Sequence, residues 1–303
     1  LLSASVLPVV YDSKADVAAW RRRLTDGLDA LIADGGTVDA TESLVPTSFF
    51  LAYQGLNDAD LMRRLAKVCV GSEVVPRHSI LSESGGRGWT ERSEGSPGDS
   101  SIHSPTPATP SKASRLKPRS DGRLRIGFLS AYFRDHTIGR LNLGRIQHLD
   151  RTRFEVTVLS ATGREDSVGT QFRAGADRYC QIPRDVKAAR ALIADQDLDV
   201  LIFADVGMDS LTATLAWSRM APVQCVTWGH PDTTGSPFID YFLSSELLET
   251  PDADSHYTER LVRLPLLATY FERPSAQSKI KNHQSSLHTY LCPQTLFKFH
   301  PDF

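Results

Sequence analysis

A loop rich in small and polar residues follows the apolar run VQCVTW and carries much of the chain's candidate chemistry. In it, His230 and Asp232 stand next to Thr233, Thr234 and Gly235. Loops at the carboxyl ends of strands in open α/β sheets are where ligands bind, and small residues let backbone amides approach an anionic group. The residue types leave two interpretations open: a loop that binds a phosphate or sugar, and a purely structural turn.

A second candidate lies in SAYFRDHTIGRL, which joins a predicted strand at residues 124–130 to a predicted helix at residues 138–148. His136 stands just before this helix and could act as a base near the top of a sheet. In the alternative interpretation, Asp135 caps the helix and His136 is a solvated loop residue.

Two aspartates follow a third apolar run, in the sequence DVGMDS. Asp205 and Asp209 could pair for general acid–base or metal chemistry. Asp209 is also a good N-cap for the helix predicted after it, and no second carboxylate cluster completes a metal site. The cap is therefore the favoured interpretation of Asp209.

The end of the sequence, YLCPQTLFKFHPDF, predicts a strand that runs into a loop with Gln294, Lys298 and His300. A lysine after a buried strand can neutralise a diphosphate leaving group. The alternative is a surface lysine in a frayed terminus.

Composition excludes several classes of protein. The 303 residues are 41% hydrophobic and 23% charged, as in ordinary soluble proteins, and no apolar run is long enough to span a membrane. A net charge of -2 does not suggest nucleic-acid binding. The four cysteines contain no CxxC pair, which predicts free thiols in a reducing, cytoplasmic or nuclear, compartment. The first residues lack the charged region of a signal peptide.

Residues 1–80 are expected to be an α-helical segment. Apolar residues recur at helical spacing over 17–33, and Gly35-Gly36 should end that helix. Further helices are predicted at 47–53 and 58–70, the latter capped by Asn57. Residues 81–121 are rich in Ser, Pro and Gly and predict a disordered linker.

From residue 122 to 274, apolar runs alternate with helical patterns. This alternation predicts an α/β fold: a Rossmann-like parallel sheet covered by helices on both faces. Strands are predicted at 124–130, 154–160, 199–205, 223–228 and 241–244, and helices at 138–148, 168–174, 186–194 and 211–220. No GxGxxG motif follows the first strand, which argues against a dinucleotide-dependent dehydrogenase.

Several blocks, in order, resemble the catalytic region of the O-linked N-acetylglucosamine transferase family, including its Spindly-like relatives. They are LRIGFLSAYFRDHTIGRL, RFEVTVLS, LDVLIFADVGM, APVQCVTWGHPDTTGSPFIDY, HYTERLVRLP and YLCPQTLFKFHPDF. The stretch LVPTSFFLAYQGLND resembles the helical segment that precedes this region in bacterial members.

The resemblance implies a GT-B-type enzyme with two Rossmann-like lobes, often attached to tetratricopeptide repeats. Residues 122–274 would be the N-terminal lobe, and residues 275–303 the start of the C-terminal, donor-binding lobe. Such an enzyme transfers a sugar with inversion from a nucleotide diphosphate, here most simply UDP-GlcNAc, to Ser or Thr of acceptor proteins, without a metal or other cofactor. Nucleic acid and membranes are not expected partners.

The resemblance also implies roles for single residues. His136 matches a cleft histidine proposed as a base or an acceptor-orienting group, and Lys298 matches the lysine that stabilises the diphosphate. Gln294 resembles a nucleotide-contacting glutamine. The cleft-facing loop would be formed by Thr233, Thr234 and Gly235.

Departures from the family pattern keep alternatives open. Thr137 replaces a common proline, and Arg178 stands where some members have a second histidine. The GHP form of the loop is shared with N-glucosyltransferases, so the donor could also be UDP-glucose or GDP-fucose. Because the sequence stops where the second lobe begins, we expect this chain to be inactive alone; a non-catalytic protein-binding module is the alternative.

Overall fold

The computed structural model describes residues 1–70, 120–267 and 269–271. The linker predicted at 81–121 lies outside the described residues except for positions 120 and 121. The predicted start of a second lobe at 275–303 lies wholly outside them.

One seven-stranded sheet organises the molecule, and all its neighbouring strands are parallel. The strand order is β3-β2-β1-β4-β5-β6-β7, so the order reverses between β1 and β4. This confirms the predicted α/β class with a parallel sheet. The strands are β1 (Leu124–Ser130), β2 (Phe154–Ser160), β3 (Arg178–Gln181), β4 (Val200–Phe203), β5 (Val223–Thr227), β6 (Tyr241–Ser245) and β7 (Arg260–Leu264).

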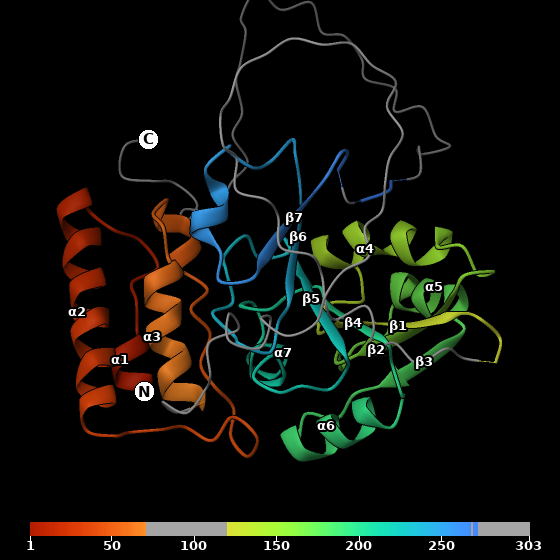
Figure 1. The fold of residues 1–303 in the computed structure, drawn as a ribbon, viewed down its shortest axis with the longest axis horizontal. Helices are drawn as coiled ribbons and strands as arrows, with labels where there is room; N and C mark the ends of the chain where they lie inside the picture. Colours follow the sequence, from red (N-terminus) through yellow and green to blue (C-terminus); the bar gives the residue numbers. More distant parts are fainter. Residues whose placement is uncertain (71–119, 268, 272–303) are drawn as a thin grey trace, which may run out of the picture.

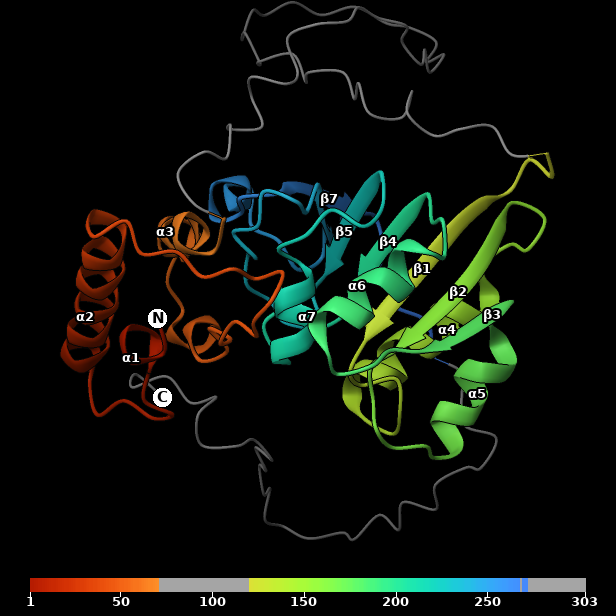
Figure 2. The same cartoon turned by 90° about the horizontal axis from the view of Figure 1, so that it is seen from below.

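Helices cover both faces of the sheet (Figure 2). On one face, α4 (Thr137–His148) and α5 (Ser167–Gly175) share a core with Phe128 and Val158. On the other face, α6 (Val186–Ala194) and α7 (Ser210–Leu215) share a core with Leu129. Alternate residues of one strand enter opposite cores because strand side chains point alternately to the two faces.

Two of these strands were not predicted from the sequence. β3 and β7 are the outer strands, each with a single neighbour in the sheet. In β3, three of the four residues are only half-buried and the fourth is exposed. β7, RLVRL, contains a single fully buried residue. Edge strands lack the continuous apolar run of central parallel strands, and so their sequences give a weak signal.

Two predicted helices are wrong in extent. At 47–53 the structure has only a 3-10 helix, η1 (Leu51–Gln54), because Phe49 stacks on His230 and Gly55 adopts a positive φ of 66°. The helix predicted at 211–220 ends at Leu215. The chain turns there, and Trp217 enters the core of the helical segment.

The helical segment comprises α1 (Leu2–Ser5), α2 (Lys14–Ala33), η1 and α3 (Ala59–Val70). It lies next to α7, at the end of the sheet away from β3 (Figure 1). The helix α3 begins one residue later than predicted, so that Asp58, and not Asn57, holds the N-cap position. The Asn57 Oδ1 still accepts a hydrogen bond from the Ala59 N–H, the first of the helix, at 2.9 Å. A short 3-10 helix, η4 (Ala253–His256), precedes β7. No helix in the described ranges is long and apolar enough to cross a membrane.

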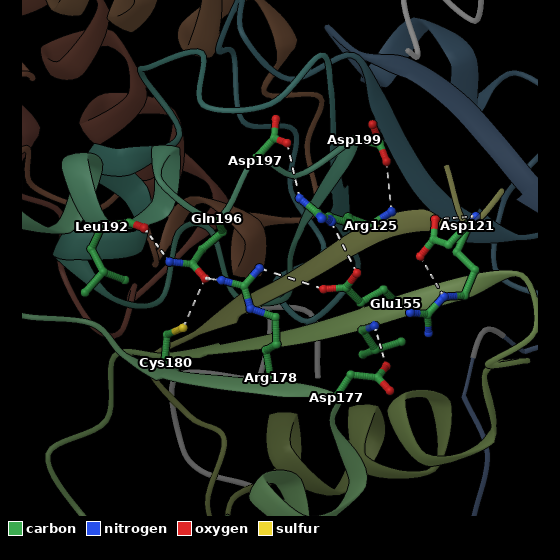
Figure 3. Close-up of polar contacts among 12 residues, drawn as sticks. Asp121, Arg125, Glu155, Asp177, Arg178, Cys180, Leu192, Gln196, Asp197 and Asp199 are labelled. Carbon is green, nitrogen blue, oxygen red and sulfur yellow. Dashed lines mark hydrogen bonds and ion pairs between the residues drawn. The ribbon is translucent and has the colours of Figure 1, made fainter. Parts of the chain in front are cut away.

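The amino ends of the central strands are held by a polar network (Figure 3). Asp199 accepts a hydrogen bond from the Arg125 N–H at 2.9 Å, which ties the chain before β4 to β1. The Arg125 guanidinium also pairs with Glu155 of β2 at 3.2 Å. This network lies at the amino edge of the sheet and links β1 to β2 and to the chain before β4.

Candidate functional site

The candidate site lies at the carboxyl edge of the sheet, where β1, β4 and β5 end. The strand order reverses between β1 and β4, and ligands of open α/β sheets bind at the carboxyl edge beside such a reversal. Three loops meet there: residues 131–136, 204–209 and 228–236. The Tyr132 hydroxyl joins the first two by donating to the Met208 carbonyl at 3.1 Å.

His136 is the N-cap of α4. Its Nδ1 accepts a hydrogen bond from the Ile138 N–H at 3.2 Å, and its ring stacks on Tyr132 with centroids 4.4 Å apart. Burial, and then the nearby Arg134 guanidinium, lower the pKa of His136, so the neutral ring dominates at neutral pH.

The alternative in which Asp135 caps α4 is therefore wrong. The Asp135 carboxylate pairs with Arg140 at 2.7 Å, and its backbone N–H donates to Asp166 at 2.7 Å. The histidine takes the cap because its backbone is extended, with φ at -149° and ψ at 158°, and its Nδ1 reaches the second N–H of the helix.

The cap also sets the tautomer of His136. A neutral imidazole has one N–H and one acceptor nitrogen. Because Nδ1 accepts from the backbone, the proton lies on Nε2. His136 can thus donate a hydrogen bond from Nε2 to a bound oxygen, and it cannot take a proton there while it remains neutral and caps the helix.

Asp205 lies beneath this edge and is fully buried. Its Oδ2 accepts hydrogen bonds from the Ala131 N–H at 2.9 Å and from the Ser130 hydroxyl at 3.1 Å. Burial raises the pKa of Asp205 to about 7, and the Asp209 carboxylate adds to the shift.

Asp209 caps α7, as favoured from the sequence, by accepting from the Leu211 N–H at 2.9 Å. It also pairs with Arg184 at 3.0 Å. Within the described ranges, no group of three or more His, Cys, Asp or Glu side chains could hold a metal ion.

His230 is only 3% exposed, and its ring stacks on Phe49 of the helical segment with centroids 5.3 Å apart. Burial lowers its pKa to about 4, and neither ring nitrogen has a hydrogen-bond partner among the described residues. Beside it lies a cavity of about 30 Å³, room for one or two water molecules. Burial, and then the Asp58 carboxylate, hold the pKa of Asp232 well above its usual range.

Thr233 and Thr234 are buried, and their hydroxyls are engaged by Glu259. The Thr233 hydroxyl donates to Oε2 at 2.6 Å, and both the N–H and the hydroxyl of Thr234 donate to Oε1. Gly235 has a positive φ of 71°, and its Cα faces the Met62 carbonyl so closely that a Cβ would lie 2.5 Å from that oxygen. That these three residues contact a nucleotide sugar stays a prediction.

The structure thus brings some of the predicted site residues together, whereas others lie outside the described residues. His136 and the loop at 228–236 share one edge of the sheet: a Cβ on Gly229 would lie 2.8 Å from Ile138, in the first turn of α4. Gln294, Lys298 and His300 lie outside the described residues.

Sequence reasoning gave no role to Glu259 or to Phe49. Both residues lie in stretches that resemble the family, HYTERLVRLP and LVPTSFFLAYQGLND. Nothing in their spacing indicates a contact with the loop at 228–236. Their contacts to this loop join positions 25 or more residues apart in the chain.

The sequence profile of Glycosyl transferase family 41 matches residues 102–280, which include the strands and loops that build this edge. The chain belongs to glycosyl transferase family 41. This confirms the resemblance to the O-GlcNAc transferase and Spindly group. Its membership rests on the α/β part of the chain, since the match excludes the helical segment.

Curated relatives of this family 41 chain include two plant proteins named "Probable UDP-N-acetylglucosamine--peptide N-acetylglucosaminyltransferase SPINDLY". The one from Arabidopsis thaliana is 31% identical over 147 residues, 46% of this chain and 16% of the relative. The one from Hordeum vulgare is 31% identical over 153 residues, 48% and 16% of the two chains. The family 41 chain therefore spans about a sixth of the length of these relatives.

A nematode protein and a solved structure are also similar to this chain. A Caenorhabditis elegans UDP-N-acetylglucosamine--peptide N-acetylglucosaminyltransferase is 28% identical over 172 residues, 54% of this chain and 14% of the relative. A mutant O-GlcNAc transferase from Thermobaculum terrenum is 32% identical, with a TM-score of 0.46 over 55% of this chain and 31% of that one.

Proposed function

We propose that this chain is the acceptor-side part of a protein O-glycosyltransferase, which moves N-acetylglucosamine from UDP-GlcNAc to Ser or Thr of acceptor proteins. The observation that carries the proposal is the family 41 match over residues 102–280, with His136 at the carboxyl edge of its sheet. The names of the plant and nematode relatives support this donor and a peptide acceptor.

The proposed reaction is a single displacement with inversion. The acceptor hydroxyl oxygen bonds to the anomeric carbon of the sugar, the bond from that carbon to the phosphate oxygen breaks, and UDP leaves with the electron pair. The hydroxyl proton passes to solvent water as the new bond forms. Catalysis of this kind depends on orienting the acceptor and on stabilising the charge of the departing diphosphate.

His136 is proposed to orient the acceptor rather than to remove its proton. A neutral ring with Nδ1 engaged by α4 presents a single N–H, at Nε2. Such a donor can fix the direction of a lone pair on the acceptor oxygen. Of the two roles left open by the sequence, the orienting role is the one that this hydrogen bond supports.

The remaining roles are proposed from the resemblance alone. Lys298 would stabilise the diphosphate, Gln294 would contact the nucleotide, and the loop from Thr233 to Gly235 would border the donor. Transfer would need no metal, and the protein would work in the cytoplasm or nucleus. Free thiols at Cys69, Cys180 and Cys225 are in keeping with a reducing compartment.

Transfer and nucleotide binding test the proposal. The purified chain, alone and mixed with the purified C-terminal lobe of a family 41 relative, is incubated with radiolabelled UDP-GlcNAc, UDP-glucose or GDP-fucose and a Ser/Thr peptide library. UDP and GDP are titrated into the same samples by calorimetry. We expect no transfer by the chain alone, so binding and transfer are compared in the mixture. We expect UDP or UDP-GlcNAc to bind in preference to GDP, and His136→Ala to lower transfer at least about tenfold. His256→Ala, at an exposed histidine, is the control. Preference for GDP-fucose, or equal transfer by both variants, would contradict the proposal.

A further inference from the structure

Glu259 is a buried carboxylate with no role in the chemistry described so far. It directly precedes β7 and is 5% exposed. A buried carboxylate is unfavourable unless hydrogen bonds compensate for the lost water. The hydrogen bonds that it accepts among the described residues come from a single loop, the one that follows β5.

Three donors of that loop converge on the Glu259 carboxylate. Oε2 receives the Thr233 hydroxyl at 2.6 Å, and Oε1 receives the Thr234 N–H at 2.9 Å together with the Thr234 hydroxyl. The residue before Glu259 contributes as well: the Thr258 N–H donates to the Thr233 hydroxyl oxygen at 2.9 Å. Both oxygens of the carboxylate thus accept hydrogen bonds from two consecutive residues of the loop.

Other residues of the same loop contact the helical segment. There, the His230 ring stacks on Phe49, and the Gly235 Cα faces the Met62 carbonyl. Ring stacking and van der Waals contact tolerate sliding, whereas hydrogen bonds to a charged acceptor are directional. The orientation of the loop is therefore determined mainly from the β7 side.

We propose that Glu259 is the positioning residue of this site: it holds Thr233 and Thr234 in one orientation and so places the backbone of residues 229–235 at the sheet edge beside His136. The part of this inference that concerns sugar transfer rests on the proposed function. The part that concerns the loop does not.

The hydrogen-bond pattern distinguishes two substitutions at this position. In Glu259→Gln, the side-chain oxygen can still accept both bonds from Thr234. The amide N–H can donate to the Thr233 hydroxyl, which turns its own proton to Thr258, 2.9 Å away. In Glu259→Leu the side chain is apolar and one atom shorter, and no donor of the loop is satisfied. The glutamine should therefore rescue what the leucine loses.

Hydrogen exchange of the full chain, measured by mass spectrometry, tests the positioning role. We expect Glu259→Leu to accelerate exchange in residues 229–236 at least about tenfold, because the variant loses hydrogen bonds to a charged acceptor. Exchange in β1 and β2 should be much less affected. Glu259→Gln should remain within about twofold of the wild type. Glu246→Leu and Glu246→Gln, at an exposed glutamate after β6, are the matched controls.

A second pair of variants covers the case in which Glu259→Leu does not fold. Thr234→Val removes the hydroxyl but keeps the shape, and Thr234→Ser keeps the hydroxyl. The valine should accelerate exchange of the loop and the serine should not. Loop exchange that is equal in Glu259→Leu and Glu246→Leu, or equal in the valine and serine variants, would overturn the proposal.

Transfer kinetics separate positioning from general stability. We expect Glu259→Leu to raise the KM for the acceptor peptide or to lower kcat about tenfold at a temperature where the variant is fully folded, with Glu259→Gln restoring the wild-type values. These kinetics are measured in the mixture with the C-terminal lobe of a relative. If the wild type transfers no sugar there, the proposed function fails, and the exchange experiment still decides the role of Glu259.

Discussion

At the scale of single residues, one hydrogen bond and burial determine the protonation of the side chains in this site. His136 is neutral because its ring is half-buried beside Arg134, and its tautomer follows from the cap on α4. Asp205 keeps its proton to about pH 7 because it is fully buried. Neither property follows from residue type, since a solvated histidine or aspartate would titrate near its ordinary pKa.

The tautomer of His136 can be observed directly. We expect nitrogen-15 NMR of the histidine-labelled chain to show an unprotonated Nδ1 and a protonated Nε2 at neutral pH, with a pKa below 6.5. His136→Asn, which keeps an oxygen for the cap, assigns the signal by its loss. A proton on Nδ1 would mean that the cap is not formed and that Nε2 is available as a base.

Asp205 makes stability depend on pH with a definite sign. Its pKa in the folded protein, about 7, is above the ordinary 3.8, so the folded state binds the proton more tightly. Its contribution to the free energy of unfolding is fully present below pH 3.8, and is lost as the pH rises to 7. The loss approaches about 1 kcal/mol per pH unit.

Asp205→Asn removes this titration and keeps an acceptor for the Ala131 N–H and the Ser130 hydroxyl. We expect the free energy of unfolding in urea to fall less between pH 5 and about pH 7 in this variant than in the wild type. Asp26→Asn, at an exposed position, is the control. Parallel pH curves for wild type and Asp205→Asn would show that Asp205 is ionised across this range.

At the scale of elements, the loop after β5 is positioned by two partners that lie far from it in sequence. Glu259 precedes β7, and Phe49 and Met62 belong to the helical segment. The helical segment therefore packs against the loop of the candidate site. A loop held by both partners has few accessible conformations, which reduces the entropy lost when it binds a ligand.

Gly235→Ala tests the contact between this loop and the helical segment. The backbone has a φ of 71°, and an added Cβ would lie 2.5 Å from the Met62 carbonyl oxygen, a main-chain atom that cannot rotate away. We expect a loss of several kcal/mol in the free energy of unfolding, together with faster hydrogen exchange in α3.

The matched control is Gly163→Ala, where no atom lies within 4 Å of the added Cβ. It should change the stability by no more than about 0.5 kcal/mol. Equal stabilities of the two alanine variants would contradict the close approach of the loop to α3.

At the scale of the whole molecule, the helical segment and the sheet share interior contacts. Trp217, which follows α7, lies in the core formed by Leu24, Leu28 and Leu65 of the helical segment. The Val45 N–H donates to the Thr214 hydroxyl of α7 at 2.8 Å in a buried hydrogen bond. We infer that the two parts fold as one cooperative unit.

Urea unfolding measures this cooperativity. We expect transitions followed by circular dichroism and by tryptophan fluorescence to coincide, and Trp217→Ala to lower the free energy of unfolding by about 3–5 kcal/mol. Trp20→Ala, at a half-buried position on α2, should cost less. Two separate transitions in the wild type would show that the helical segment is an independent domain.

The sequence by itself determined the α/β class and most of the central elements. β1, β2 and α6 have the predicted bounds, because continuous apolar runs and helical periodicity are local patterns. The cap at Asp209 and the hydrogen bond of Asn57 at the start of α3 were also local, since each side-chain oxygen accepts a bond from an N–H two residues along the chain. Family membership was likewise readable from ordered blocks of sequence, now matched over residues 102–280.

Only the tertiary structure decided what the candidate residues do. The edge strands β3 and β7 form because a neighbour pairs with them, and their own sequences are too short and polar to predict this. The engagement of the threonines by Glu259, the buried state of His230 and the raised pKa of Asp205 depend on contacts or burial created by distant parts of the chain. Residue type defines which hydrogen bonds are possible, whereas packing determines which are made and which charges lose water.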